Sequence, residues 1–276
     1  MFTLSTDTHS LVQLLVQEAA FSGAASALWS GQSISAEGIA GSSSALAVAA
    51  LFQHGNGTIM VVTPNTDSAE QITDDIILFL APEYRLNGSE SVLYFPPMPH
   101  HDSESESALA IADEAFGERV TVLKRLLSPG EHRLVLVVPM SALVQPVPPP
   151  AFLKERTQTL AVKSQVDLES LRRFLVEGGY HATTAVDLPG EFAVRGYILD
   201  LFAPDWDQPV RIEFFNDEIE SIRRFDLTTQ RSLETMTAID LTRLQPYECT
   251  GASLLDYICA STPIVLVEPT AMQECR

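Results

Sequence analysis

Hydrophobic and polar positions follow two different rhythms along the chain, and the first covers about residues 1–155. In this part, apolar residues at helical spacing alternate with short, nearly continuous runs of Val, Leu and Ile. Such apolar strands between amphipathic helices are typical of a parallel sheet that is covered on both faces. The pattern predicts an α/β domain with helices at about 11–19, 43–53, 68–80 and 108–127 and strands at 34–39, 58–63, 92–95 and 133–138.

The second rhythm begins after the proline-rich segment Pro146–Pro150. Strand patterns now follow one another with a single helical pattern among them. Strands without intervening helices usually pair antiparallel, so this part indicates an α+β module inserted into the α/β domain. Its expected elements are strands at 159–162, 191–201, 210–215 and 219–226 and a helix at 168–177, after which the α/β rhythm resumes with a helix at 254–260 and a strand at 264–267.

The overall charge narrows the function classes. The chain of 276 residues carries 36 acidic and 17 basic side chains, which gives a formal net charge of −19. Hydrophobic residues make up 46% of the chain, which excludes a disordered or fibrous polypeptide. Because nucleic-acid binding relies on clustered Lys and Arg, the acid excess argues against DNA or RNA binding by this chain alone.

The distribution of basic residues also bears on targeting. No basic residue precedes Arg85, so the positive charges of a signal or transit peptide are missing. The most apolar runs, 45–52 and 134–138, are far shorter than the ~20 residues that span a bilayer. We therefore expect a cytoplasmic chain.

Cysteine and histidine give little support for a metal site. Cys249, Cys259 and Cys275 are odd in number and too widely spaced for a CxxC metal site or a readable disulfide framework. The adjacent His100 and His101 form the one histidine pair, and neighbouring loop residues rarely chelate together. We expect no metal.

Residues 38–45 (GIAGSSSA) occupy the place of a phosphate-binding P-loop, between a strand-like segment and a helix. Gly38 and Gly41 fit such a loop, but the pattern ends in Gly-Lys-Ser/Thr, where this chain has Ser43, Ser44 and Ala45. The missing lysine would neutralise the phosphates and the missing hydroxyl would bind Mg²⁺. The segment is either a degenerate nucleotide site or a plain small-residue turn, and in both cases no nucleotide cofactor is expected.

A second segment that resembles a degenerate nucleotide-site motif lies near the end of the chain. The apolar strand at 264–267 precedes Glu268, and Val267 stands where a Walker B strand carries its Mg²⁺-binding aspartate. Alone, this is an ordinary buried strand. Together with residues 38–45 it indicates a disabled ATPase fold.

Two segments carry a family resemblance: residues 190–202 (GEFAVRGYILDLF) and 210–220 (VRIEFFNDEIE). They are similar to the UvrA-binding domain shared by UvrB and the bacterial transcription-repair coupling factor, and weaker similarity extends over nearly the whole chain. UvrB keeps the Walker lysine and a long tyrosine-rich hairpin that slides between DNA strands. Here Ser44 and the short segment 96–107 (PPMPHHDSESES) stand in those places, so the resemblance favours the coupling factor, whose N-terminal region is likewise a UvrB mimic with a decayed nucleotide site.

The resemblance implies a non-catalytic adaptor that recruits UvrA in transcription-coupled nucleotide excision repair. The coupling factor's polymerase-binding domain and DNA translocase would be absent from this chain, so RNA polymerase and DNA are partners of those absent parts. The chain is thus expected to be an N-terminal fragment. Its expected domains are a degenerate P-loop-like α/β domain at 1–157, the UvrA-binding α+β domain at 158–243 and the start of a truncated α/β domain at 244–276.

Two alternatives stay open at this point. One is a UvrB-like, ATP-dependent damage-recognition subunit of the excinuclease, against which the missing lysine, aspartate and hairpin argue. The other is an unrelated α/β protein, which would require the two-segment match to be accidental.

The binding residues follow from strand alternation and from the resemblance together. Along 210–215, even-numbered residues such as Ile212 and Phe214 share one face, and Arg211 and Phe215 share the other. A large ring beside an arginine on a polar face has the composition of an interface hot spot. The resemblance adds Arg195, so we expect Arg195, Arg211 and Phe215 to bind UvrA.

Each of these assignments has a plain alternative. Phe215 could be an exposed aromatic residue without a function, and Arg195 could form a surface ion pair with Glu191 or Asp217, which would contribute little. Core positions are expected at Phe192, Val194, Ile198 and Phe202.

Overall fold

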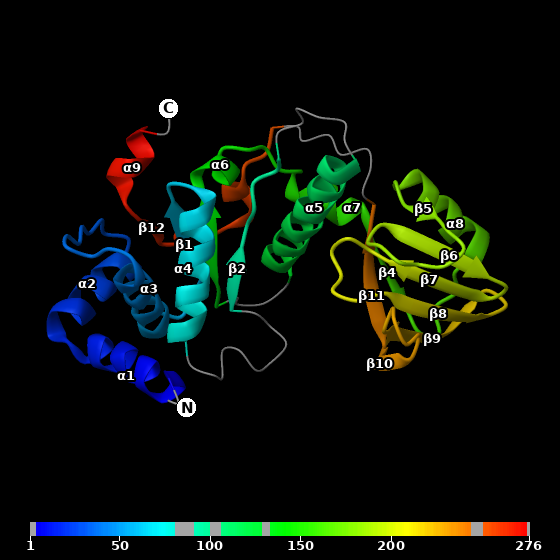
Figure 1. The fold of residues 1–276 in the computed structure, drawn as a ribbon, viewed down its shortest axis with the longest axis horizontal. Helices are drawn as coiled ribbons and strands as arrows, with labels where there is room; N and C mark the ends of the chain where they lie inside the picture. The colour runs from blue at the N-terminus through cyan, green and yellow to red at the C-terminus, as the bar shows by residue number, and fades with distance from the viewer. Residues whose placement is uncertain (1–3, 81–90, 100–105, 129–132, 244–250, 275–276) are drawn as a thin grey trace. The chain divides into compact units, whose positions relative to one another are not determined.

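The computed structural model describes the chain except for residues 1–3, 81–90, 100–105, 129–132, 244–250 and 275–276 (Figure 1). The chain divides into two compact units. Unit 1 comprises residues 1–98, 125–145 and 254–276, and unit 2 comprises residues 99–124 and 146–253. The domain boundaries expected from the sequence, at 157/158 and 243/244, stay a prediction.

Within the described residues, unit 1 is built on a parallel four-stranded sheet in the order β12-β1-β3-β2. The two central strands, β1 (Ile59–Thr63) and β3 (Val135–Pro139), are buried at every residue. β2 (Val92–Tyr94) and β12 (Ile264–Leu266) form the edges. The parallel pairing confirms the predicted parallel sheet. The burial of β1 and β3 explains their unbroken apolar runs, since such strands are covered on both faces.

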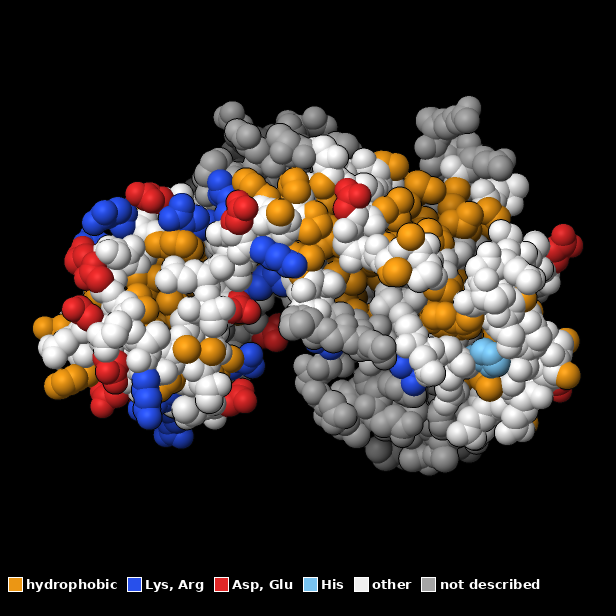
Figure 2. All heavy atoms as spheres, turned by 180° about the vertical axis from the view of Figure 1, so that it is seen from behind, with side chains coloured by type: hydrophobic (Ala, Val, Ile, Leu, Met, Phe, Trp, Pro, Cys, Tyr) orange, Lys and Arg blue, Asp and Glu red, His pale blue; other side chains and the backbone are white. Residues whose placement is uncertain are grey.

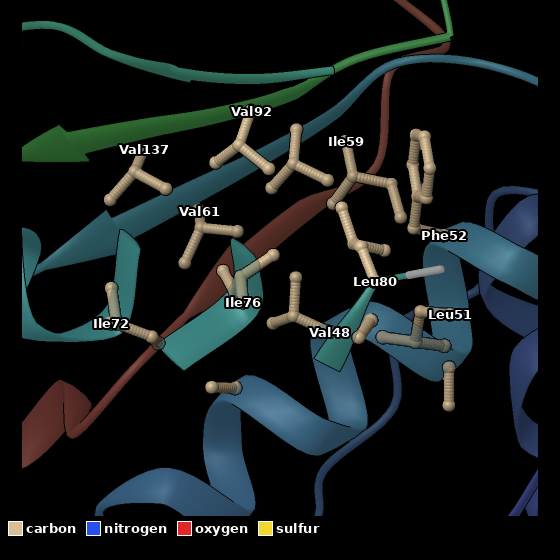
Figure 3. Packing of buried hydrophobic residues seen from close by; sticks show 14 of the residues in the cluster. Val48, Leu51, Phe52, Ile59, Val61, Ile72, Ile76, Leu80, Val92 and Val137 are labelled. Atoms are coloured by element: carbon tan, nitrogen blue, oxygen red, sulfur yellow. The ribbon is translucent and has the colours of Figure 1, made fainter. Parts of the chain in front are cut away.

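Helices α3 and α4 pack on one face of this sheet, and Figure 3 shows their apolar side chains among those of the strands. Val48 and Phe52 of α3 and Ile72 and Ile76 of α4 are buried around Val61 of β1. Residues four apart lie on one side of a helix, so this spacing produces a continuous apolar stripe. The helices of unit 1 are α1 (Leu4–Gln17), α2 (Ala19–Trp29), α3 (Ser42–His54), α4 (Thr66–Phe79), α6 (Met140–Leu143), the 3₁₀ turn η2 (Leu254–Tyr257) and α9 (Pro269–Glu274).

The predictions of two elements in unit 1, the strand at 34–39 and the helix at 254–260, are wrong. Residues 34–39 are irregular and exposed instead of forming a strand. The segment has only two large apolar side chains, Ile34 and Ile39, which are too few to bury against a sheet. The helix expected at 254–260 is a single 3₁₀ turn, since the chain turns at 259–262 to enter β12.

Within the described residues, unit 2 contains a six-stranded sheet in the order β10-β9-β8-β7-β6-β5 and a separate two-stranded ladder of β11 and β4. All neighbours are antiparallel except the parallel pair β5 and β6. The expected antiparallel pairing of consecutive strands is therefore confirmed. The strands are β4 (Thr157–Ala161), β5 (His181–Ala182), β6 (Glu191–Arg195), β7 (Ile198–Phe202), β8 (Val210–Phe215), β9 (Glu218–Phe225), β10 (Ser232–Met236) and β11 (Ala238–Thr242).

Helix α8 (Leu168–Glu177) packs on what we name the inner face of the six-stranded sheet. Leu171 and Leu175 of the helix join Phe192, Ile212 and Phe214 of the strands in the core of unit 2. The two remaining helices are α7 (Pro150–Glu155) and α5 (Glu106–Leu127), of which the last three residues belong to unit 1. The opposite side of the sheet is named the outer face.

The single strand expected at 191–201 is a hairpin, β6–β7, that turns at residues 196 and 197. A two-residue turn reverses the parity of the alternation, so Phe192 faces the core together with Leu199 and Leu201. Ile198 and Phe202 therefore lie on the outer face. The expected core position of Ile198 is wrong, since its side chain is 36% exposed, whereas Phe202 is buried in a small cluster with Val186.

Candidate protein-interaction surface

Two hairpin turns lie side by side at one end of the six-stranded sheet of unit 2, which we name the tip. Residues 196 and 197 connect β6 to β7, and residues 216 and 217 connect β8 to β9. The backbone N–H of Phe214 donates to the carbonyl of Tyr197 at 2.8 Å and ties the two turns together. Gly196 (φ 61°) and Asn216 (φ 54°) supply the positive φ that tight hairpin turns require at their first position.

Strand register determines which outer-face residues are neighbours, because directly paired residues share a face. Nearest the tip, one row runs from Arg195 through Ile198 to Glu213. The next row inward contains Asp200 and Arg211. The register thus puts Arg195 and Arg211 on the outer face in successive rows, and alternation along β8 puts Phe215 on the same face, beyond Glu213 at the turn.

The tip exposes three large apolar side chains. Phe215 is 69% exposed, Tyr197 is 63% exposed and Ile198 is 36% exposed. Apolar side chains that gather at one point, rimmed by polar residues, are a feature of interaction sites, whereas single exposed ones are ordinary. Sequence reasoning found Phe215 but missed Tyr197 and Ile198, and only the two-residue turn between β6 and β7 could have revealed them.

Arg211 is held firmly on the outer face. Its Nε donates to Oδ1 of Asp200 at 2.6 Å, and its Nη2 donates to Oδ2 of the same carboxylate at 2.9 Å. Nη2 also donates to Oε1 of Gln230 at 3.1 Å, and the guanidinium carbon lies 4.6 Å from the centre of the Phe225 ring. The hydrogen bond with Asp200 raises the pKa of the Arg211 guanidinium. Arg211 is therefore paired with a carboxylate and only 22% of its side chain is exposed.

Arg195 is exposed and sits beside the segment before β6. Its Nε and Nη2 both donate to the backbone carbonyl of Thr184, at 3.2 and 2.7 Å. Among the residues that the structure describes, neither Glu191 nor Asp217 forms an ion pair with it, and Glu191 instead accepts two backbone N–H groups at residues 187 and 188. The ion-pair alternative for Arg195 is therefore not what this structure contains.

Acidic residues surround the apolar tip. Asp217, Glu218 and Glu220 are exposed at the β8–β9 turn beside Phe215. Glu213, in the row behind, accepts from the Ser221 hydroxyl at 2.7 Å and from Nη2 of Arg223 at 3.1 Å. Figure 2 shows acidic and basic side chains interspersed on the visible face of unit 2. The tip thus combines exposed apolar side chains with the exposed Arg195 and the acidic side chains of the β8–β9 turn, a composition typical of protein interfaces.

The P-loop-like segment of unit 1 offers little to a nucleotide. Its two glycines have positive φ, and α3 begins directly after Gly41. The Ser43 hydroxyl accepts from the N–H of Ala40 at 3.0 Å and donates to the carbonyl of Ala40 at 2.7 Å. Ser44 and Ala45, in the lysine and hydroxyl positions, are buried in the first turn of α3. In the segment predicted to be a degenerate Walker B strand, the N–H of Val267 donates to the carbonyl of Val62 of β1.

Within the described part of the chain, no group of three or more His, Cys, Asp or Glu side chains could hold a metal ion. His100 and His101 lie outside the described residues. Among those that are described, no single helix is long and apolar enough to cross a membrane, although the bent pair Ser10–Gln17 and Ala19–Trp29 passes by length and composition.

Comparisons with known proteins match the chain to one domain family and to several relatives. Residues 159–247, which contain the six-stranded sheet and its tip, match the model of the UvrB interaction domain. The chain is 34% identical to the transcription-repair-coupling factor of Bacillus subtilis over 205 residues, or 74% of this chain and 16% of that protein. It is 33% identical over 217 residues to the factor of Myxococcus xanthus, covering 78% of this chain and 17% of that protein. The Escherichia coli factor is 32% identical over 204 residues, with 74% and 17% covered.

These matches show that the chain carries a UvrB interaction domain. Over about three quarters of its length, it is a relative of the bacterial transcription-repair-coupling factors. The chain spans about a sixth of the length of these relatives. The resemblance noted in the sequence is confirmed.

Proposed function

We propose that this chain is a non-catalytic adaptor that recruits UvrA in transcription-coupled nucleotide excision repair, in the cytoplasm. The adaptor surface is the tip of unit 2, with Phe215 as its apolar anchor and Arg195 and Arg211 as its hydrogen-bond donors. RNA polymerase and DNA would be partners of other parts of a longer protein.

The observation that carries this proposal is the exposure of Phe215 within the matched domain. A phenylalanine that is 69% exposed contributes nothing to the core of unit 2, and it stands beside two further exposed apolar side chains. Aromatic and arginine side chains dominate the binding energy of protein interfaces. The match to a domain named for interaction supports the same role.

The non-catalytic part of the proposal rests on unit 1. With Ser44 at the lysine position and Val267 at the aspartate position, no lysine would neutralise the phosphate charge and no aspartate would bind Mg²⁺. In this proposal, the parallel sheet of unit 1, as far as the structure describes it, has a structural role and no catalytic one. A UvrB-like ATPase is disfavoured by the same two positions.

The direct test is calorimetric titration of purified UvrA into the 276-residue chain. We expect saturable binding by the parent and a strong loss of affinity in Phe215→Ala. Leu233→Ala is the matched control, because Leu233 is also an exposed apolar residue of the same sheet, at 52%, but lies on the edge strand β10. No binding by the parent, or equal losses in both variants, would refute the proposal.

A further inference from the structure

Asp200 is a buried carboxylate in the middle of the outer face. Its residue is 4% exposed, and it lies on β7 between Ala193 of β6 and Arg211 of β8. A charge at this depth is stable only when it is paired and hydrogen-bonded, and Arg211 supplies both. A side chain so covered cannot touch a partner protein itself.

The pairing fixes how the Arg211 guanidinium is presented. Asp200 takes the Nε–H and one Nη2–H, and Gln230 takes the other Nη2–H. Gln230 is itself oriented, because its Nε2 donates to the carbonyl of Leu227 at 2.9 Å and so turns Oε1 toward Arg211. A guanidinium has five N–H donors, and these three hydrogen bonds use the one on Nε and both on Nη2. The two donors on Nη1 have no acceptor among the described residues.

We propose that Asp200 is a positioning residue of the tip surface: it holds Arg211 side-on, so that Nη1 is left to donate to an acceptor oxygen on UvrA. This inference rests on the proposed function and names the chemistry of one contact. Because the Asp200–Arg211 pair is neutral as a whole, the contact depends on hydrogen-bond geometry more than on net charge. A backbone carbonyl or a carboxylate of UvrA would satisfy it.

Asp200→Asn tests the positioning role with almost no change of volume. An asparagine can accept from Nε with its oxygen, but its amide N–H₂ then faces the donors of Nη2, so the guanidinium must rotate away. We expect at least a tenfold weaker affinity for UvrA, measured by calorimetry at a temperature where both proteins are fully folded. Glu234→Gln is the control: it removes one carboxylate from another arginine pair on the same sheet, with Arg224, and should change the affinity less than threefold.

A double-mutant cycle separates positioning from mere structural support. If Asp200 acts through Arg211, then Asp200→Asn should cause no further loss of affinity when Arg211→Gln is already present. The Asn–Gln pair of the double variant contains no buried charge. The double variant is therefore expected to fold even if one of the single variants unfolds. Near-ultraviolet circular dichroism checks that each variant is folded.

The outcomes are distinct. A tenfold loss in Asp200→Asn that disappears in the Arg211→Gln background supports the inference. An unchanged affinity, or losses that multiply independently in the double variant, overturns it while leaving UvrA recruitment intact. Absence of binding by the parent chain overturns the proposed function instead.

Discussion

Phe214 and Phe215 are adjacent in β8 and lie on opposite faces of its sheet. Phe214 is 5% exposed and packs in the core of unit 2, whereas Phe215 is 69% exposed at the tip. Successive side chains of a strand alternate sides, so two identical residues acquire different roles from their position alone. The pair therefore provides an internal control for any test of the tip surface.

Phe215→Ala should weaken UvrA binding without affecting the fold. Interface anchors typically lose ~2–4 kcal/mol on truncation, which is roughly 30- to 1000-fold in affinity. Calorimetry measures the affinity, and thermal unfolding should show an unchanged midpoint. Phe214→Ala should instead leave a core cavity and cost ~3–5 kcal/mol of folding free energy. The reverse pattern would mean that the register of β8 is shifted by one residue.

Arg211→Ala should destabilise the fold as well as weaken binding. Truncating a surface side chain usually costs little stability, but without Arg211 the buried carboxylate of Asp200 would lose both of its hydrogen bonds. Removing one partner of a buried pair costs ~3–5 kcal/mol, and the partial exposure of Arg211 places the effect at the lower end. Urea unfolding measures it. Arg195→Ala, which frees only a backbone carbonyl at the surface, should stay within ~1 kcal/mol of the parent.

Much of the fold was predictable, because local patterns determine it. The unbroken apolar runs at β1 and β3 predicted the parallel sheet, and strict alternation predicted the two faces of β8. The segment 34–39 was mistaken for a strand because a few apolar residues can resemble one when no partner is considered. Neither β10 nor β11 is predicted from the sequence, because each has only five residues: SLETM has two apolar positions, and the alternation of buried Ile239 and Leu241 in AIDLT is too short to stand out.

The candidate site was predictable only in part. Phe215 was found because alternation places an apolar ring on a polar face. The prediction of a single strand at 191–201 puts Ile198 in the core, whereas the two-residue turn after Arg195 inverts the parity of every later residue. The role of Asp200 depends on its cross-strand partner Arg211, and register between strands cannot be read from either strand alone.

The two residues that sequence reasoning missed at the tip give a further prediction. Tyr197→Ser and Ile198→Ser should each lower the affinity for UvrA by about 3- to 30-fold, since both side chains are exposed beside Phe215 and add apolar area to the contact. Leu188→Ser, a change at an exposed apolar residue outside the tip, serves as the control. Wild-type affinity in both tip variants would restrict the surface to Phe215 and the arginines.

The proposed non-catalytic role predicts that the chain neither binds nor hydrolyses ATP. In the proposed correspondence with a P-loop ATPase, Ser44 and Val267 stand where phosphoryl transfer depends on a lysine and a Mg²⁺ ligand. Calorimetric titration with ATP and Mg²⁺ should give no saturable heat up to millimolar concentrations. Micromolar, Mg²⁺-dependent binding would contradict this prediction and revive the ATPase alternative.

The N-terminus of α8 should make stability depend on pH. The Asp167 carboxylate accepts from the N–H of Ser170 at 2.9 Å and from its hydroxyl at 2.6 Å, and these bonds lower the pKa of Asp167 below its ordinary value of 3.8. A lowered pKa in the folded state means that the charged form stabilises the fold. This contribution is complete above about pH 5 and is lost as the pH falls through the ordinary value of 3.8 and then through the lower folded-state pKa.

Asp167→Ala should therefore lower the midpoint of thermal unfolding by about 2–4 °C at pH 7, as expected for the loss of a helix cap. The difference from the parent should persist down to about pH 5 and shrink below it. Asp167→Asn is the control, because asparagine keeps a capping oxygen but has no proton to gain, so its difference from Asp167→Ala should not vary with pH. A parent-to-alanine difference that stays constant to pH 2.5 would show that the charge of Asp167 contributes nothing to the stability of this helix.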